Sequence, residues 1–157
     1  MKLKVQRLSE DAVIPFLKKE HFPYYSLFSP CSIRLPPNEL SIISLDIAIE
    51  IPEGFYGQIL HSEKINMIDS HITTLPKIIT SSGPKVLSVN LFNSNLPANL
   101  FYDSDSVQNI YDSVFPSDSH ISITKGVEIA NLVIHKNNKA AIEEVEFDEK
   151  YLTNSLQ

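Results

Sequence analysis

The stretch from Ile33 to Ile59 reads Ile-Arg-Leu-Pro-Pro-Asn-Glu-Leu-Ser-Ile-Ile-Ser-Leu-Asp-Ile-Ala-Ile-Glu-Ile-Pro-Glu-Gly-Phe-Tyr-Gly-Gln-Ile, and it decides the fold. From Ile43 to Ile51 a branched apolar residue occupies every second position, with Ser, Asp, Ala and Glu between them. This period of two predicts a half-buried β-strand. Proline cannot donate a ladder hydrogen bond, so Pro-Pro and Pro-Glu-Gly predict turns on either side of it. The stretch therefore predicts strand, turn, strand, turn, strand.

The same pattern recurs along the chain. Alternation or short apolar runs predict further strands at Lys85 to Phe92, Ile121 to Ile123 and Ile129 to His135, with an opening strand near Val5. Many short strands at roughly even spacing are typical of an all-β sandwich or barrel. The best helix candidate is short, with Asp105 as its N-cap. At 157 residues, we expect a single domain over residues 1–157.

Composition excludes several function classes. The chain is 43% hydrophobic and 20% charged and carries a net charge of -6, which is ordinary for a globular protein and argues against nucleic acid or an anionic membrane as the main partner. No apolar run approaches the ~20 residues of a membrane span. Cys31 is the only cysteine and no secretory signal is visible, so we expect an intracellular protein, in the cytoplasm or nucleus or within a virion.

Six landmarks resemble the trimeric dUTPases, which cleave dUTP to dUMP and pyrophosphate. In order they are Arg7 to Pro15, Tyr25 to Ser29, Ile33 to Gly57, Val89 to Asn93, Lys125 to Val133 and Glu143 to Glu149. The resemblance implies a distorted jelly-roll β-barrel of the trimeric dUTPase type. It also implies a homotrimer in which the C-terminal strand, here Ala141 to Glu149, is exchanged between subunits.

The strands and turns resemble the family, but most residues that would carry the family's chemistry are replaced. The first motif's aspartate falls on Ser26. The second motif, whose arginine and serine bind phosphates, falls on the region of Ser62 and Glu63. The water-activating aspartate and the tyrosine under the deoxyribose fall on Thr80 and Gly83. In the fourth motif, Val127 and Glu128 stand in place of the Asp-Arg pair, and Asn131 stands in place of the glutamine.

Ser62 matches the serine of the second motif and keeps that role open, whereas Glu63 puts a negative charge where a phosphate should lie, and the other positions lack the required groups. A positioned general base contributes ~10²–10⁴ in rate, and threonine cannot supply one near neutral pH. The glycine-rich arm that closes over the nucleotide is expected to be absent, because only four glycines occur and none follows Gly126. We therefore expect no dUTP hydrolysis, no cofactor and no metal.

The resemblance implies two functions from different classes. The first is a catalytically inactive dUTPase-like protein that serves as a protein-interaction or structural module, virion-associated or host-modulating, with itself and an unknown protein as partners. The alternative is a residual or altered nucleotide hydrolase or nucleotide sensor, and Mg²⁺ would be needed only in that case.

An insertion at about residues 95–119 is longer than the tight hairpin the family has there. It carries large apolar and aromatic residues, including Phe101, Tyr102, Ile110, Tyr111 and Phe115. A connection of this length is usually functional or disordered, and its aromatic content argues against disorder. Two interpretations stay open: the insertion packs over the barrel mouth, or it is a partner-binding surface.

Other constellations are weak. The five histidines and Cys31 show no zinc-ligand spacing. Ser62 lies next to His61 and near Asp69, but adjacency in sequence is not triad geometry, so we expect solvated loop residues. The bulky residues from Lys18 to Tyr25 are expected to fill the space in front of the first motif.

Overall fold

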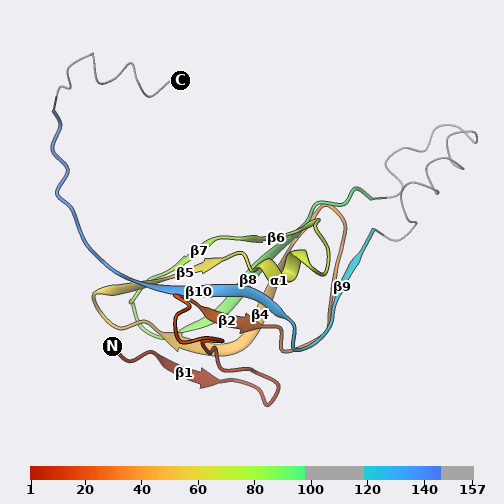
Figure 1. Cartoon of the computed structure of the whole chain (residues 1–157), viewed down its shortest axis with the longest axis horizontal. Helices are drawn as coiled ribbons and strands as arrows, with labels where there is room; N and C mark the ends of the chain where they lie inside the picture. The colour runs from red at the N-terminus through yellow and green to blue at the C-terminus, as the bar shows by residue number, and fades with distance from the viewer. Residues whose placement is uncertain (98–118, 146–157) are drawn as a thin grey trace, which may run out of the picture.

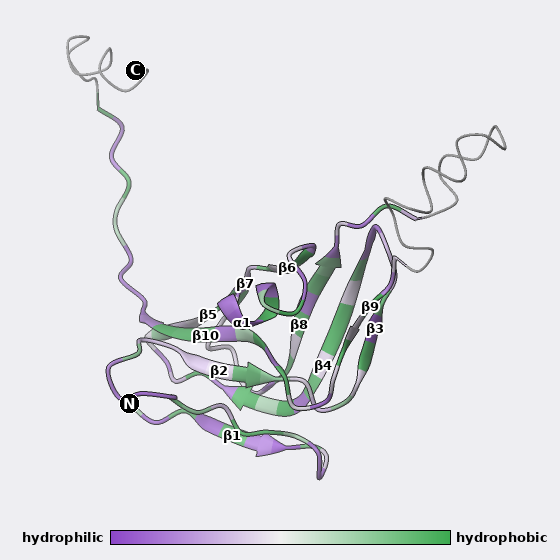
Figure 2. Cartoon of the chain, turned by 45° about the vertical axis from the view of Figure 1, so that its right-hand side comes forward, coloured by the Kyte–Doolittle hydropathy of each residue, from purple (hydrophilic) through white to green (hydrophobic). Residues whose placement is uncertain are grey.

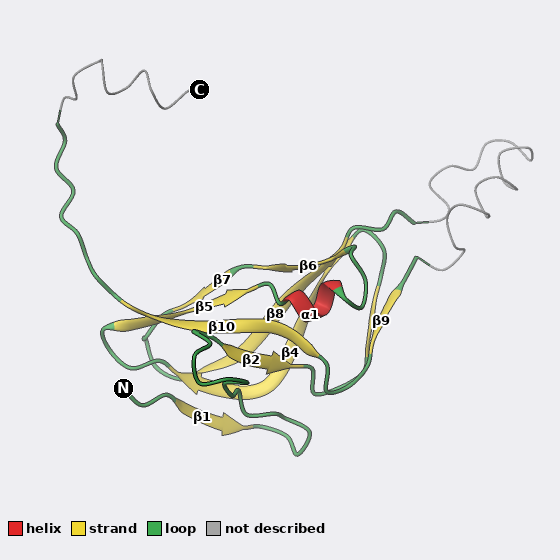
Figure 3. Ribbon diagram, in the orientation of Figure 1, coloured by secondary structure: helices red, strands yellow, loops and turns green. Residues whose placement is uncertain are grey.

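The computed structural model describes residues 1–97 and 119–145 (Figure 1). Almost all of the regular structure is β-strand, as Figure 3 shows. The strands are β1 (Lys4–Arg7), β2 (Tyr25–Phe28), β3 (Ile33–Leu35), β4 (Glu39–Glu50), β5 (Phe55–Leu60), β6 (Ile72–Leu75), β7 (Lys77–Ile79), β8 (Lys85–Asn93), β9 (Ile121–Ile123) and β10 (Glu128–Lys136). A single turn of helix, α1 (Glu63–Asn66), follows β5.

The strands form two four-stranded sheets and a two-stranded ribbon. The first sheet has the order β1-β4-β8-β6, the second has the order β2-β10-β5-β7, and β3 pairs with β9. Every pairing within these sheets is antiparallel. The predicted all-β fold is therefore confirmed, and so are the strand-turn-strand-turn-strand order of residues 33–59 and the strands predicted elsewhere in the described part of the chain.

The core lies between the two sheets. Along β4, the branched apolar side chains from Ile43 to Ile49 are buried and the residues between them are more exposed, as the period of two predicts. The inner side chains of β8 meet them, and Leu27, Ile59 and Leu132 close the core from the second sheet. Figure 2 shows the hydrophobic residues along β4 and β8. Burial of these branched side chains is the main stabilising contribution to the fold.

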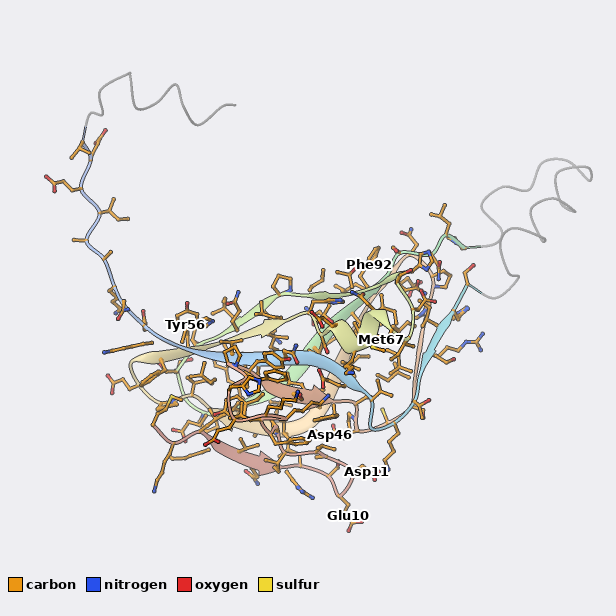
Figure 4. All side chains as sticks on the ribbon, viewed as in Figure 1. Glu10, Asp11, Asp46, Tyr56, Met67 and Phe92 are labelled. Atoms are coloured by element: carbon orange, nitrogen blue, oxygen red, sulfur yellow. The ribbon has the colours of Figure 1, made fainter. Side chains whose placement is uncertain are left out.

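One irregularity interrupts β4. Its register against β8 shifts between Ser44 and Ala48, and Asp46 adopts the left-handed region with φ of 53°. The backbone N–H of Asp46 donates to Ser44 Oγ at 3.2 Å, and its carboxylate accepts from Ser44 Oγ at 2.9 Å and Ser9 Oγ at 3.2 Å. Asp46 is labelled in Figure 4. A bulge of this kind bends a strand and increases its local twist.

Some features differ from the sequence prediction or lie beyond it. The sequence pattern did not identify β6, β7 or α1. Residues 141–145 form no strand in this single chain and extend away from the sheets, with Ile142 100% exposed (Figure 1). Residues 146–149 of the predicted exchanged strand lie outside the described residues, as do the candidate helix and the candidate interaction residues Phe101, Tyr102, Ile110, Tyr111 and Phe115.

Within the described ranges, none of the helices is long and apolar enough to cross a bilayer.

Candidate functional site

A cavity of about 540 Å³ opens on the outer side of the second sheet. Its walls come from the segment before β2, the end of β5, the start of α1 and the first half of β10. The lining residues are Lys18, Lys19, Phe22, Tyr24, Leu60, His61, Ser62, Glu63, Lys64, Glu128, Asn131 and Val133. Three lysines and two glutamates therefore surround one opening.

Glu128, the first residue of β10, is the buried charge of this cavity and is only 7% exposed. Ser62 Oγ donates a hydrogen bond of 2.5 Å to Glu128 Oε1. The Lys18 ammonium forms an ion pair with Glu128 Oε2. The carboxylate is thus held by a hydroxyl on one oxygen and an ammonium group on the other, which is the arrangement that a buried charge requires.

The environment of Glu128 favours its charged form. Burial raises the pKa of the carboxyl. The hydrogen bonds from Lys18 and Ser62, together with the positive charge of Lys18, outweigh that effect and leave the pKa below its usual value of 4.5. Glu128 is therefore an anion near neutral pH.

Lys18 reaches Glu128 because the segment before β2 is fixed in place. Phe16 forms an isolated bridge with Ser26, and the Phe16 ring stacks on Phe28 with centroids 5.2 Å apart. The Lys18 ammonium also lies 5.9 Å from the centre of the Phe28 ring. Further along, Phe22 stacks on Tyr24 at 5.2 Å. We refer to residues 16–24 as the strap. The bulky residues from Lys18 to Tyr25 were expected to fill the space around the family's site, whereas four of them line an open cavity.

Ser62 also organises the start of α1. It is the N-cap residue, with φ of -99° and ψ of 133°, and its hydroxyl accepts from Lys64 N at 3.2 Å. A serine N-cap satisfies one of the free N–H groups of the first helical turn. One side chain thus links α1 to the first residue of β10, 66 positions away.

Asn131 completes the polar floor of the cavity. It lies opposite Ser26 in the pairing of β10 with β2. With its amide nitrogen turned toward the carboxylate, it donates to Glu128 Oε1 at 3.1 Å and to Ala130 O at 3.2 Å. Ser26 is fully buried beneath.

The structure brings four of the seven predicted site residues together and leaves three apart. Ser62, Glu63 and Asn131 line the cavity, and Ser26 pairs with Asn131 below it. The other three, Thr80, Gly83 and Val127, do not line it.

Thr80 and Gly83 lie in the loop between β7 and β8. Thr80 Oγ1 accepts from Lys85 Nζ at 2.6 Å, and Gly83 has φ of 93° in open space. Val127 is half-buried and packs against the core at the turn before β10. None of these three contributes a group to the cavity of its own chain.

One expectation from the sequence is wrong. Ser62 is not a solvated loop residue, since it is only 1% exposed. The triad rejected from the sequence is not formed by these residues: His61 Nδ1 accepts from Thr74 N at 3.2 Å, and Asp69 pairs with His71. The Lys18–Glu128 pair was missed altogether, because no local pattern connects residues 110 positions apart.

Among the described residues, no group of three or more His, Cys, Asp or Glu side chains could hold a metal ion.

Known proteins are similar to this chain in sequence and in fold. No family model matches the chain. The dUTP nucleotidohydrolase of avian adenovirus 8 is 24% identical over 144 residues, which is 92% of this chain and 74% of that protein. The Early 4 ORF1 protein of human adenovirus C serotype 2 is 34% identical over 85 residues, 54% of this chain and 63% of that protein. The human mitochondrial dUTP nucleotidohydrolase is 36% identical over 59 residues, 38% of this chain and 23% of the enzyme. The matches thus span less than two thirds of the length of these last two relatives.

Solved structures show the same fold over nearly the whole chain. The D95N dUTPase of phage phi11 of S. aureus matches with a TM-score of 0.74 at 24% identity, covering 95% of this chain and 99% of that one. The dUTPase of Staphylococcus bacteriophage 80alpha matches with a TM-score of 0.72 at 22% identity, covering 94% and 98%.

The protein is an all-β domain with the dUTPase fold. The sequence relatives, two of them adenoviral, place it further as a dUTPase-related protein, so the resemblance inferred from the sequence is confirmed.

Proposed function

We propose that this dUTPase-related protein does not hydrolyse dUTP and acts through protein contacts, as an interaction or structural module of intracellular or virion location. The observation that carries the proposal is the pairing of the buried Glu128 carboxylate with Lys18 and Ser62. The family resemblance expects an arginine at this position, whereas this chain has a buried carboxylate already neutralised by Lys18 and Ser62.

Electrostatics argues against a triphosphate in the same cavity. Two unit charges of the same sign at about 4 Å repel by about 4 kcal/mol at an effective dielectric of 20. A triphosphate next to Glu128 would either meet this repulsion or draw Lys18 away and leave the buried carboxylate unpaired. Glu63 adds a second negative charge to the lining.

Catalytic groups are also missing at the expected positions. The aspartate that would activate water corresponds to Thr80, whose hydroxyl is hydrogen-bonded to Lys85. Self-association as a homotrimer with an exchanged C-terminal strand remains part of this proposal, as the family resemblance implies.

The alternative, a residual or altered nucleotide hydrolase or sensor, has one observation in its favour. The cavity is open, and Lys19, Lys64 and Ser62 line it alongside Asn131. A small anion could contact Lys19 and Lys64 without displacing Lys18. Mg²⁺ would accompany a nucleotide in that case.

One experiment separates the two functions. Pyrophosphate release from dUTP with Mg²⁺ is measured beside an active dUTPase at equal concentration, and thermal unfolding is recorded with and without dUTP. We expect no release above the enzyme-free rate and no shift in Tm. Saturable turnover would refute the first function, and a Tm shift without turnover would support a nucleotide sensor.

A further inference from the structure

Thr74 of β6 joins the first sheet to the second beside the cavity. It is only 2% exposed. The Thr74 hydroxyl donates to the carbonyl oxygen of Ile129 in β10 at 3.0 Å, and the Thr74 backbone N–H donates to His61 Nδ1 at 3.2 Å. His61 directly follows the last residue of β5 and lines the cavity. One threonine of the first sheet is therefore bonded to two segments that belong to the other sheet.

The contact with His61 protects a sheet edge. Strand β6 is the last strand of its sheet and pairs with β8 on one side. The Thr74 N–H is directed at the imidazole and not at β8, so without His61 it would be a donor on the free edge. A buried N–H that lacks an acceptor destabilises the fold, because it has already lost its water. His61 thus supplies the acceptor that this edge needs.

The hydrogen bond requires a neutral imidazole. A backbone N–H can only donate, so Nδ1 of His61 must offer a lone pair and the ring proton must lie on Nε2. In the imidazolium both ring nitrogens carry protons, and the Nδ1–H would then face the Thr74 N–H. Histidine is the side chain that ordinarily takes up this proton between about pH 8 and pH 5. Protonation of His61 therefore removes the acceptor of Thr74.

The charged neighbours of His61 do not restore the lost contact. Five charged side chains line the cavity with it, namely Lys18, Lys19, Glu63, Lys64 and Glu128. Three lysines and two glutamates have a formal charge of +1, which a protonated His61 raises to +2. Glu128 is already paired with Lys18, and in the loop before β6 Asp69 is paired with His71. Strand β6 itself reads Ile-Thr-Thr-Leu and offers no carboxylate.

The position of His61 extends the effect to the cavity wall. Ser62, the next residue, is the N-cap of α1 and donates to Glu128. Helix α1 packs against both β6 and β10 (Figure 1). Release of His61 from Thr74 would therefore free the connection between β5 and α1, which is one wall of the cavity.

We propose that His61 is a pH-dependent latch between the cavity and the free edge of β6: the neutral imidazole holds the Thr74 N–H, and the protonated imidazole releases it. Acidification then opens the β6 edge and loosens one wall of the cavity, while the remaining strands stay paired. The latch goes beyond the proposed function and does not depend on whether dUTP is hydrolysed.

The first test observes the hydrogen bond itself. In the isotope-labelled full chain, NMR detects a scalar coupling between two nitrogen atoms that an N–H···N hydrogen bond joins. We expect this coupling between the Thr74 amide nitrogen and His61 Nδ1 at about pH 7.5, and we expect it to be lost at about pH 5.5. Absence of the coupling at the higher pH would overturn the proposal.

The second test measures the opening of the edge by hydrogen exchange. Protection of the Thr74 amide, corrected for the intrinsic pH dependence of exchange, is divided by that of the Leu132 amide in β10, which reports global unfolding. This ratio should fall about fivefold between about pH 7.5 and about pH 5.5, the effect of losing one net hydrogen bond. In His61→Asn the amide oxygen can take the place of Nδ1 and gains no proton, so the ratio should stay constant.

Each outcome decides. A wild-type ratio that does not change with pH would refute the latch, and so would an equal fall in His61→Asn. His71→Asn removes an exposed histidine outside the cavity lining, so loss of the pH response in this variant would refute the role of His61. Circular dichroism checks that each variant is folded, and the two wild-type measurements decide even if a variant is not.

Discussion

Replacing Lys18 by methionine should destabilise the protein more than replacing its partner, Glu128, by glutamine. Methionine keeps most of the length of Lys18 and removes its charge, so the buried carboxylate loses its ammonium partner. Glutamine keeps the shape of Glu128, and its amide oxygen can still accept from Ser62. In that variant the lysine, whose side chain is 34% exposed, can turn toward water.

The expected magnitudes follow from burial. Removing one partner of a fully buried pair costs about 3–5 kcal/mol, whereas exposed pairs contribute about 0–1 kcal/mol. Glu128 is buried but Lys18 is about one third exposed, so we expect a loss of about 2 kcal/mol for Lys18→Met. For Glu128→Gln we expect about 1 kcal/mol or less. In a domain of this size, 2 kcal/mol corresponds to a fall in Tm of roughly 4–8 °C.

The pH dependence of stability should differ between wild type and Lys18→Met. In wild type the folded pKa of Glu128 is lowered, so its contribution to stability is present above the unfolded value of 4.5 and is lost as pH falls through the folded pKa. Without Lys18, the ammonium hydrogen bond and charge that lower the pKa are both removed, so we expect burial to dominate and the folded pKa to rise. The carboxyl then destabilises the fold near neutral pH, and this loss is recovered as pH falls through the raised pKa. The stability difference between wild type and Lys18→Met should therefore shrink on acidification.

Urea unfolding followed by circular dichroism measures both effects, at about pH 7.5 and about pH 6. Lys19→Met is the matched control, because the Lys19 ammonium lies over the Phe22 ring, 5.5 Å from its centre, and is not part of the Lys18–Glu128 pair. Equal costs for Lys18→Met and Glu128→Gln would contradict the reasoning. So would a cost for Lys18→Met that stays constant with pH.

Two further changes test the cavity and the core beneath it. Ser62→Ala removes both an N-cap and a hydrogen bond to a buried carboxylate. We expect it to lower the free energy of unfolding in urea by about 1–3 kcal/mol. Ser70→Ala, at an exposed position, is the control and should change that free energy by less than about 0.5 kcal/mol. Gly57→Ala would place its Cβ 3.2 Å from Ile51 Cδ1 and from Leu132 Cδ1, so we expect a loss of about 1–3 kcal/mol, and unchanged stability would mean that the two side chains can move aside.

The local part of the fold was accessible from the sequence because side-chain alternation is a local signal. Each residue from Ile43 to Glu50 reports its own face of β4, and prolines mark the turns. The bulge at Asp46 was not predicted, since the alternation of burial continues through it. Strands β6 and β7 have only four and three residues and are separated by Pro76 alone, so they show too few periods to be recognised.

The candidate site was only partly accessible. A register taken from the family resemblance named Ser26, Ser62, Glu63 and Asn131, and the fold brings these four together. That register could not predict the Lys18–Glu128 pair, because an ion pair between the strap and β10 depends on how two distant segments meet.

The Lys18–Glu128 pair also makes the construction of a phosphate site in this cavity depend on more than one residue. A buried ion pair is stable only while both charges and their hydrogen bonds are present. Glu128→Arg alone would place two cations where one ion pair now lies, leave Ser62 without its carboxylate acceptor and retain Glu63 in the lining. A triphosphate site would therefore require changes in the strap, in α1 and in β10 together.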